Sequence, residues 1–566
     1  MEKVSHGYTG AGPHLSFGHT AMRSSYNAMS VFDRRSRRVS RRRRRVPDLA
    51  SRPAVVPNKP YKFKRQHHWG RMILRTLIVT AIVGGIVGGF ILVRALTAGD
   101  RVRIQVLGAE GRPLEGALVT TESGHDATTV EGGLARIAFE VPGTLTVSAQ
   151  GYRSATYTVE QLPLQGALGL QMEPLVLQGR VTDSNGIGVV GARVTINDMS
   201  TITQEFGSFE IVEAMPGTVM VEKAAWESAT AEWSGDRRRL DVKMDAFMVR
   251  GLRVEPKTAG DDALFAQILE FADESTVNAL VFDTKIELGN VVHEIDGYDE
   301  PAAIGSLQPV YDVRRRLAQA KEHGLYTITR IVTWQDPYAS LHRNQYAMHN
   351  SVDGDTWVTW NGLGWMDPTD RGSWEYPISL GVAACKMGFD EIQFDYVRFP
   401  SDGDINIAVY DHPEFLTPEG RVAIVGEFLT TARERINAEG CAVSADIFAI
   451  ILSVRDEQGI GQKVEELSAT VDAISPMVYP SHYGPGWLNF DNPNDHPAEV
   501  VGEALESGMI RMEGGALLRP WIQAFSWTTA QVREAIATAE DLNMGWLLWN
   551  QLSYYEMEWL PPDESR

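Results

Sequence analysis

The last 320 residues of the chain alternate between strand-like and helical segments, and this alternation limits the possible folds more than any other feature. The eight apolar runs of strand length cover residues 248–254, 278–284, 326–334, 391–397, 442–448, 473–480, 519–525 and 545–551. The helical stretches between them include residues 261–275, 312–323, 374–387 and 421–438. Such alternation predicts a parallel (β/α)₈ TIM barrel with long loops over residues 247–566. A doubly wound open sheet is the main alternative, but no glycine-rich phosphate-binding turn follows the first run.

Acidic side chains stand near the carboxyl ends of these runs, where the active sites of barrels form. The run GFDEIQFDYVRFP, residues 388–400, begins with a glycine and continues as a short strand that delivers Asp395 to its far end. Asp446 occupies a similar place in the next run. Two carboxylates on adjacent strand ends can flank a glycosidic bond, one as the acid and one as the nucleophile or base. We therefore predict Asp395 and Asp446 as the catalytic pair.

The neighbours of these two aspartates suggest different roles. Arg398 lies three positions beyond Asp395, and a nearby guanidinium is expected to lower the pKa of the carboxyl and keep it ionised as the nucleophile. Asp446 is followed by Ile447 and Phe448. An apolar setting is expected to raise its pKa, which suits a general acid. A purely structural Asp395–Arg398 ion pair at the barrel rim is the alternative.

Further polar and aromatic side chains near the same strand ends are predicted to bind the substrate. They are Asp283, Arg330, Trp334, Arg398, Tyr479, His482, Gln523, Trp549 and Asn550. Aromatic planes can pack against the C–H faces of sugar rings, while acids and amides pair with the hydroxyl groups. The predicted ligand is therefore a polysaccharide. No cofactor is predicted, and no Cys/His cluster in the sequence indicates a metal site.

Three motifs resemble a family of glycoside hydrolase-like domains long catalogued as of unknown function. Residues 362–403 combine a Trp-x-Asp-Pro turn, a helix and the strand that ends at Asp395. The segments TITRIVTWQDP, residues 327–337, and ISPMVYPSHYGPG, residues 474–486, also look like that family. The resemblance covers about residues 250–560. It implies a TIM barrel, a hydrolytic role on polysaccharide and an extracytoplasmic setting.

A more distant similarity to chitinase-type barrels fails at the positions that matter for chemistry. Their fourth strand reads like GFDGxDxDxE, and here Gly388-Phe389-Asp390 and Asp395 match it. Gln393 replaces the middle aspartate, and Val397 stands at the position of the catalytic glutamate. The chain therefore lacks the acid that substrate-assisted chitin cleavage requires there.

An internal repeat of about 75 residues precedes the barrel. The first copy covers residues 100–170 and the second covers residues 171–246. Turns such as Gly116-Ala117 in the first copy recur as Gly191-Ala192 in the second, and short alternating strands lie between them. This pattern predicts two small β-sandwich modules. The copies resemble the carboxypeptidase regulatory-like domain, and we interpret the pair as a stalk.

The amino-terminal region differs in charge from the rest of the chain. Residues 1–75 hold 18 Lys and Arg against 3 Asp and Glu, whereas the remaining residues hold 35 against 70. An uncharged apolar run, residues 76–93, follows and predicts one transmembrane helix over residues 76–96. The positive-inside rule keeps residues 1–75 in the cytoplasm as a disordered tail near anionic lipid, with no nucleic-acid partner expected. The later domains of this single-pass plasma-membrane protein then lie outside.

The two cysteines, Cys385 and Cys441, are too few for a disulfide framework. Both stand beside apolar residues, so the sequence predicts two buried free thiols.

These observations together predict a multidomain, membrane-anchored extracytoplasmic glycoside hydrolase that acts on a cell-wall or capsular polysaccharide. A non-catalytic carbohydrate-binding or envelope-scaffolding protein is the alternative. A polysaccharide deacetylase or esterase fits less well, because neither paired metal ligands nor a nucleophile elbow is present.

Overall fold

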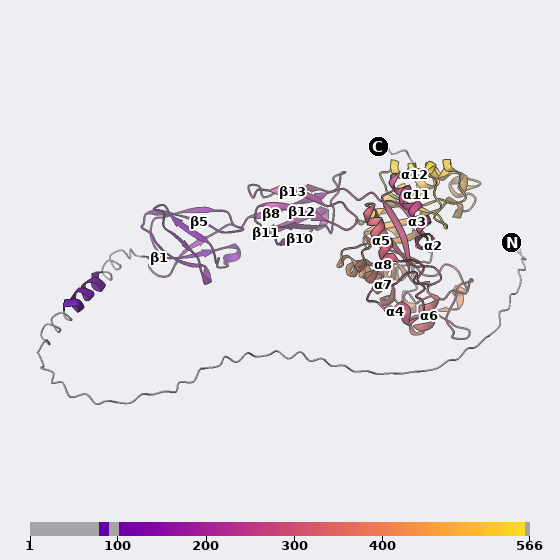
Figure 1. The fold of residues 1–566 in the computed structure, drawn as a ribbon, viewed down its shortest axis with the longest axis horizontal. Helices are drawn as coiled ribbons and strands as arrows, with labels where there is room; N and C mark the ends of the chain where they lie inside the picture. Colours follow the sequence, from indigo (N-terminus) through magenta and orange to yellow (C-terminus); the bar gives the residue numbers. More distant parts are fainter. Residues whose placement is uncertain (1–77, 90–100, 561–566) are drawn as a thin grey trace, which may run out of the picture. The chain divides into compact units, whose positions relative to one another are not determined.

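The computed structural model describes residues 78–89 and 101–560, and its carboxyl-terminal part is a closed parallel barrel (Figure 1). The barrel strands are β15 (Arg250–Val254), β16 (Ala279–Lys285), β17 (Tyr326–Val332), β19 (Glu391–Asp395), β21 (Ala442–Phe448), β22 (Ala473–Val478), β24 (Trp521–Gln523) and β25 (Trp546–Trp549). Each of these strands pairs in parallel with the next, and β25 pairs with β15 to close the sheet. The prediction of a (β/α)₈ barrel is confirmed.

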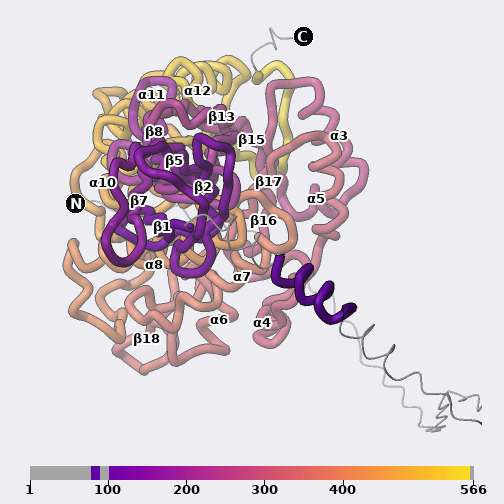
Figure 2. The backbone as a smooth tube through the Cα atoms, turned by 90° about the vertical axis from the view of Figure 1, so that its left-hand side faces the viewer, coloured from indigo at the N-terminus to yellow at the C-terminus, as the bar shows by residue number. Residues whose placement is uncertain are grey.

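Helices surround this barrel (Figures 1 and 2). The longer ones are α3 (Asp262–Asp273), α5 (Val313–Glu322), α7 (Glu375–Lys386), α8 (Pro418–Asn437), α11 (Pro497–Arg511) and α12 (Thr529–Asp541). The shorter ones are α2 (Pro256–Gly260), α4 (Glu300–Ala303), α6 (Pro337–His342), α9 (Ile450–Ser453) and α10 (Val464–Leu467). Helix α11 lies beside α12 in both views. Gly388 and Gly440 follow α7 and α8 with φ of 110° and 97°, a conformation that favours glycine between a helix and the next strand.

The barrel strands separate two hydrophobic clusters because successive side chains point to opposite faces. Phe282 and Phe394 belong to the large core between the strands and the helices. Val281 and Ile328 belong to a smaller cluster inside the barrel. A polar side chain two residues beyond an interior residue therefore also faces inward, toward the carboxyl end of the barrel.

The repeat before the barrel forms two β-sandwiches with the same topology. The first contains β1 (Arg101–Leu107), β2 (Leu118–Thr121), β3 (Asp126–Thr128), β4 (Leu134–Ala138), β5 (Gly143–Ser148), β6 (Ala155–Val159) and β7 (Leu168–Gln171). The second contains β8 (Val176–Thr182), β9 (Arg193–Ile196), β10 (Met199–Ile202), β11 (Ser208–Val212), β12 (Gly217–Glu222), β13 (Ala229–Trp233) and β14 (Val242–Lys243). The sheets β4-β1-β7 and β3-β2-β5-β6 of the first correspond to β11-β8-β14 and β10-β9-β12-β13 of the second. The predicted pair of β-sandwich modules is confirmed.

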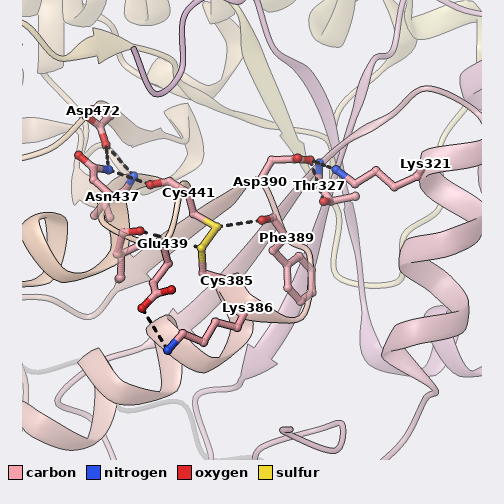
Figure 3. Close-up of a disulfide and its surroundings, with 12 residues drawn as sticks. Lys321, Thr327, Cys385, Lys386, Phe389, Asp390, Asn437, Glu439, Cys441 and Asp472 are labelled. Carbon is pink, nitrogen blue, oxygen red and sulfur yellow. Dashed lines mark hydrogen bonds and ion pairs between the residues drawn. A yellow bond between two sulfur atoms is a disulfide. The ribbon is translucent and has the colours of Figure 1, made fainter. Parts of the chain in front are cut away.

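Cys385 and Cys441 form a disulfide, so the prediction of two free thiols is wrong (Figure 3). Cys385 lies near the end of α7, and Cys441 directly precedes β21. Helix α7 leads into β19, which is the neighbour of β21 in the sheet. The fold thus brings the two Cα atoms to 5.9 Å across 56 residues of sequence. That proximity depends on strand pairing, which the local sequence around each cysteine does not show.

The predicted tail and the two ends of the predicted membrane helix lie outside the described residues. Residues 78–89 form a helix. Across residues 78–89 and 101–560, no helix combines the length and the apolarity needed to cross a membrane.

Candidate active site

The two-residue period of the strands brings charged side chains into the carboxyl end of the barrel. Arg330 follows the interior residue Ile328 by two positions in β17. In β19, Gln393 donates a hydrogen bond of 3.2 Å to Ser475 of β22 across the barrel, and Asp395 lies two positions further on. Both charged residues are buried, with exposed fractions of 1% for Arg330 and 4% for Asp395. Burial of charge on this scale requires partners.

Arg330 is the centre of the charge network in the barrel. Its Nε and Nη2 atoms donate to Asp395 Oδ2 at 2.9 and 2.7 Å, and its Nη1 donates to Asp283 Oδ1 at 2.9 Å. Its Nη2 also pairs with Glu287. Arg253 donates to the other oxygen of Asp283 at 2.7 Å. Burial acts against the charge of Arg330, but the surrounding carboxylates raise its pKa well above the usual range.

Asp446 is the second predicted catalytic residue and lies deeper than Asp395, with an exposed fraction of 1%. Its Oδ1 accepts a hydrogen bond of 2.7 Å from the indole Nε1 of Trp521. Burial and the nearby Asp395 raise its pKa well above the usual range, while Arg330 acts in the opposite sense. The predicted direction for Asp446 is therefore confirmed, with Asp395 as a contributing cause. A carboxyl group of this kind keeps its proton and can donate it.

The two carboxyl groups share Arg330 between them. Arg330 Nε lies 2.9 Å from Asp395 Oδ2 and 3.9 Å from Asp446 Oδ2, so these two oxygens are less than about 7 Å apart. Carboxyl pairs of glycosidases are separated by about 5–5.5 Å in retaining enzymes and by about 6.5–9.5 Å in inverting enzymes. The gap is therefore compatible with a catalytic pair.

The ion pair expected between Asp395 and Arg398 does not form, and Arg330 takes that place. Arg398 Nη1 instead donates to Phe399 O at 3.2 Å and to Ser401 Oγ at 3.0 Å. The reason is the backbone beyond β19, which turns sharply. The residue after Asp395 has φ of 51°, a left-handed conformation that is uncommon for a bulky side chain. Spacing along the sequence therefore misassigned the partner of Asp395.

The left-handed residue is Tyr396, and its conformation serves the site in two ways. Its backbone N–H donates to Asp395 Oδ1 at 2.6 Å. Its ring lies 4.9 Å from the guanidinium carbon of Arg398. Strained residues of this kind persist only where their surroundings hold them, and they are frequent at functional sites.

A cavity of about 630 Å³ opens above this network. The polar side chains that line it are Glu287, Arg330, Asp395, Arg398, Asp446 and His482. The aromatic ones are Tyr396, Phe448, Tyr479, Tyr483, Trp487, Trp521 and Trp549. A cavity of this size with an aromatic wall and a charged floor is typical of small-molecule and sugar sites.

Seven predicted site residues come together in this cavity. They are Arg330, Asp395, Arg398, Asp446, Tyr479, His482 and Trp549. Burial raises the pKa of Tyr479 well above the usual range, and the nearby Asp446 and Asp395 add to the effect. Burial lowers the pKa of His482. Both side chains are therefore neutral hydrogen-bonding groups at neutral pH.

Four predicted substrate-binding residues are not part of the cavity lining and make contacts within the protein. Trp334 is fully buried outside the barrel and packs against Phe428 of α8 at a ring distance of 5.0 Å. Asp283 uses both oxygens on Arg330 and Arg253. Gln523 accepts hydrogen bonds from Ser481 and donates to Asn494 and Phe525, which ties three loop segments together. Asn550 donates to Ala524 O and caps the turn after β25. The sequence showed their place near strand ends but not their bonding partners.

Several side chains that line the cavity escaped sequence reasoning. Trp521 lies two positions before Gln523, so the strand period could have placed it inside the barrel. Glu287 follows β16 by two residues in a turn. Tyr483 and Trp487 belong to the loop after β22, where no period exists to indicate direction. In the part of the chain that the structure describes, no cluster of three metal-ligating side chains occurs.

Comparisons with known proteins identify a family for the barrel. Residues 251–555 match the family model described as "Putative glycosyl hydrolase domain". The chain is similar to the solved structure of a hypothetical protein from Ruminiclostridium thermocellum ATCC 27405, with 31% identity, coverage of 34% of this chain and 96% of that chain, and a TM-score of 0.31.

Two further solved structures share about a tenth of their residues with the chain. The spore cortex-lytic enzyme SleL from Bacillus megaterium QM B1551 has 10% identity, coverage of 55% of this chain and 72% of that chain, and a TM-score of 0.34. The glycoside hydrolase domain of PelA from Pseudomonas aeruginosa has 10% identity, coverage of 54% and 96%, and a TM-score of 0.32. No curated protein matches the chain.

Proposed function

The chain belongs to the family described as "Putative glycosyl hydrolase domain", and from this premise we propose that it hydrolyses a polysaccharide through Asp395 and Asp446. The observation that carries the proposal is the difference between these two carboxyl groups on one cavity floor. Asp395 forms an ion pair with Arg330, whereas burial and the charge of Asp395 favour a protonated Asp446. Glycoside hydrolysis requires one carboxyl group of each kind.

In the proposed reaction, Asp446 donates its proton to the glycosidic oxygen as the C–O bond to that oxygen breaks. Asp395 either attacks the anomeric carbon or removes a proton from the attacking water. Arg330 donates twice to Oδ2 of Asp395 and the backbone N–H of Tyr396 donates once to Oδ1, so a lone pair on Oδ1 remains for this step. Water is the second substrate, and no cofactor takes part.

A glycan panel tests the proposal with the purified full chain. Wild-type protein is expected to release reducing ends from at least one cell-wall or capsular polysaccharide. Asp395→Asn and Asp446→Asn are expected to abolish the release, because the first removes the carboxylate and the second removes the acid. Proton NMR of the first-formed anomer then distinguishes retention from inversion. Equal turnover by wild type and Asp395→Asn would reject this catalytic pair.

A non-catalytic carbohydrate-binding or scaffolding role is the second candidate. It is favoured by the deep burial of the pair, since Asp395 and Asp446 have exposed fractions of only 4% and 1%. Binding of a glycan by wild type, with no turnover and with the same affinity in Asp395→Asn, would support this role instead.

We further propose that the chain is anchored in the plasma membrane through residues 76–96, with the β-sandwich modules and the barrel outside. The uncharged run of residues 76–93 and the basic segment before it support this orientation. The Cys385–Cys441 disulfide supports it independently, because disulfides persist in oxidising compartments. Protease added to intact cells should degrade the barrel and spare a tag at residue 1. Protection of the barrel under these conditions would contradict the orientation.

A further inference from the structure

Arg398 differs from every other buried arginine in the described part of the chain. The five arginines buried there are Arg253, Arg316, Arg330, Arg398 and Arg519. Arg253 and Arg330 pair with Asp283, Arg316 pairs with Asp262, and Arg519 pairs with Glu391. No carboxylate among the described residues lies within 4.0 Å of the nitrogens of Arg398. Its exposed fraction is nevertheless only 8%.

Three aromatic rings hold the guanidinium of Arg398 in place. Its central carbon lies 4.6 Å from the ring of Phe448, 4.9 Å from that of Tyr396 and 5.4 Å from that of Trp365. Its Nη1 donates to Phe399 O and Ser401 Oγ. Cation–π contacts orient such a group but satisfy none of its hydrogen-bond donors. The stacking therefore fixes the plane of the guanidinium and leaves its edge available.

Part of that edge faces open space. A guanidinium has five N–H donors, and only Nη1 of Arg398 makes hydrogen bonds within the described residues. The unpartnered Nε atoms of Arg253 and Arg519 are sealed from solvent, whereas Nε and Nη2 of Arg398 are not. Arg398 lines the cavity beside Asp395 and Asp446. Its free donors are therefore accessible from the cavity.

The pairing of charges in the cavity, rather than their sum, leaves Arg398 without a partner. Arg253 and Arg330 take all three of the carboxylates Asp283, Glu287 and Asp395 in ion pairs, while Asp446 favours its neutral form. Burial lowers the pKa of Arg398, and Asp395 and Asp402 act on it only from beyond ion-pair distance. A desolvated cation without a counter-charge is costly, and a planar fork of free N–H donors matches a carboxylate or a phosphate.

We propose that Arg398 binds an anionic substituent of the sugar, so that the substrate is an acidic polysaccharide carrying carboxylate or phosphate groups. This inference rests on the proposed function and adds the chemical class of the substrate. In this role Arg398 is a specificity-determining residue. Asp395 and Asp446 act on the glycosidic bond, and Arg398 selects the sugar unit that is placed beside them.

A ring-matched set of sugars tests the proposal on the full chain carrying Asp395→Asn, so that no turnover is needed. The probes are glucose, glucuronate and glucose 6-phosphate, together with galactose, galacturonate and galactose 6-phosphate, and binding is measured by ligand-observed NMR at physiological salt. Salt matters because the chain beyond residue 75 is strongly acidic and would repel anions in a weakly screened buffer. The carboxylate and phosphate members of the set distinguish the two kinds of anion.

At least one acidic sugar is expected to bind about tenfold or more tightly than its neutral partner. Arg398→Met should remove this preference, and Arg398→Lys should retain part of it because the charge remains. Arg371→Met is the matched control, since Arg371 also stacks on two rings, those of Trp374 and Phe415, but pairs with Glu427 outside the cavity. This control should leave the preference unchanged.

Equal binding of acidic and neutral sugars, binding of none of the acidic sugars, or a preference that survives Arg398→Met would overturn the proposal. These outcomes are separable from failure of the proposed function. An Arg398-dependent preference in a protein that cleaves no glycan supports the anion site and rejects the hydrolase. Wild-type cleavage confined to neutral glycans supports the hydrolase and rejects the anion site.

Discussion

The two ends of strand β19 carry aspartates with contrasting surroundings. Asp390, just before the strand, accepts hydrogen bonds of 2.7 and 2.9 Å from Thr327 and pairs with Lys321, near the Cys385–Cys441 disulfide (Figure 3). Asp395, at the other end, pairs with Arg330 and lines the cavity. Five positions thus separate an aspartate that ties the strand to its neighbours from one that faces open space. Barrels place stability at the amino ends of their strands and chemistry at the carboxyl ends.

The largest expected effect concerns the cavity end. Asp395→Asn should lower kcat/KM on a cleaved glycan by at least about 10³-fold, because the amide can neither attack nor take up a proton. Initial rates of reducing-end release give this ratio. The thermal unfolding midpoint is measured alongside to separate loss of chemistry from loss of the fold, since the single amide oxygen of Asn can accept from Arg330 or from Tyr396 but not from both. Undiminished kcat/KM would place the chemistry elsewhere in the barrel.

The next effect concerns the Cys385–Cys441 disulfide, near the amino-terminal end of β19. Replacing both Cys385 and Cys441 with alanine should lower the free energy of unfolding by about 4 kcal/mol, because the disulfide closes a loop across 56 residues. Urea denaturation with and without reductant measures this loss. Reductant should destabilise the wild type and leave the double variant unchanged. Activity at 25 °C should persist in the variant, since the disulfide lies away from the cavity residues.

A smaller effect is the pH dependence of stability and activity that Asp446 causes at the cavity end of the barrel. Asp446 has a raised pKa in the folded chain, so its bound proton stabilises the fold fully below the unfolded pKa of about 3.9. This contribution is lost as the pH rises through the folded value. The value of kcat/KM should fall about tenfold per pH unit above that point, because the acid is then ionised.

Thermal unfolding as a function of pH checks the same group without activity. The stability of the wild type relative to Asp446→Asn should decline as the pH rises from the unfolded pKa to the folded one and level off above it, where kcat/KM begins to fall, because asparagine does not titrate. A difference that stays constant with pH would show that Asp446 does not change its protonation there.

The smallest effect returns to Asp390. Asp390→Asn should lower the free energy of unfolding by about 1 kcal/mol, because it removes the charge from hydrogen bonds to Thr327 and Lys321 that are partly exposed. Denaturant titration measures the loss, and kcat/KM should stay within about twofold of the wild-type value. A large loss of activity would contradict the division between the two strand ends.

Much of the fold followed from local pattern. The eight strands and the long helices were predictable because short apolar runs and helical spacing are written into consecutive residues. The sequence also placed Asp395, Asp446 and Arg330 near the carboxyl ends of the strands. It could not place Trp334, which lies beyond the end of β17 where the period stops, and which packs on Phe428.

The pairing of charges was beyond sequence reasoning. Arg398 was the nearest basic residue to Asp395 along the chain, yet Arg330 from a different strand is its partner. The turn at Tyr396 redirects the chain and sends Arg398 to a separate part of the cavity wall. Local spacing says little about partners wherever the backbone leaves a regular element.

The sequence by itself determined the alternation of elements, the repeat of the β-sandwich modules and the position of the polar residues near strand ends, because each of these depends on neighbours along the chain. Only the tertiary structure decided that Cys385 bonds to Cys441, that Arg330 joins Asp395 to Asp283, and that Arg398 has no counter-ion among the described residues. Those outcomes depend on closing a sheet of eight strands, which brings together side chains that the chain order keeps far apart.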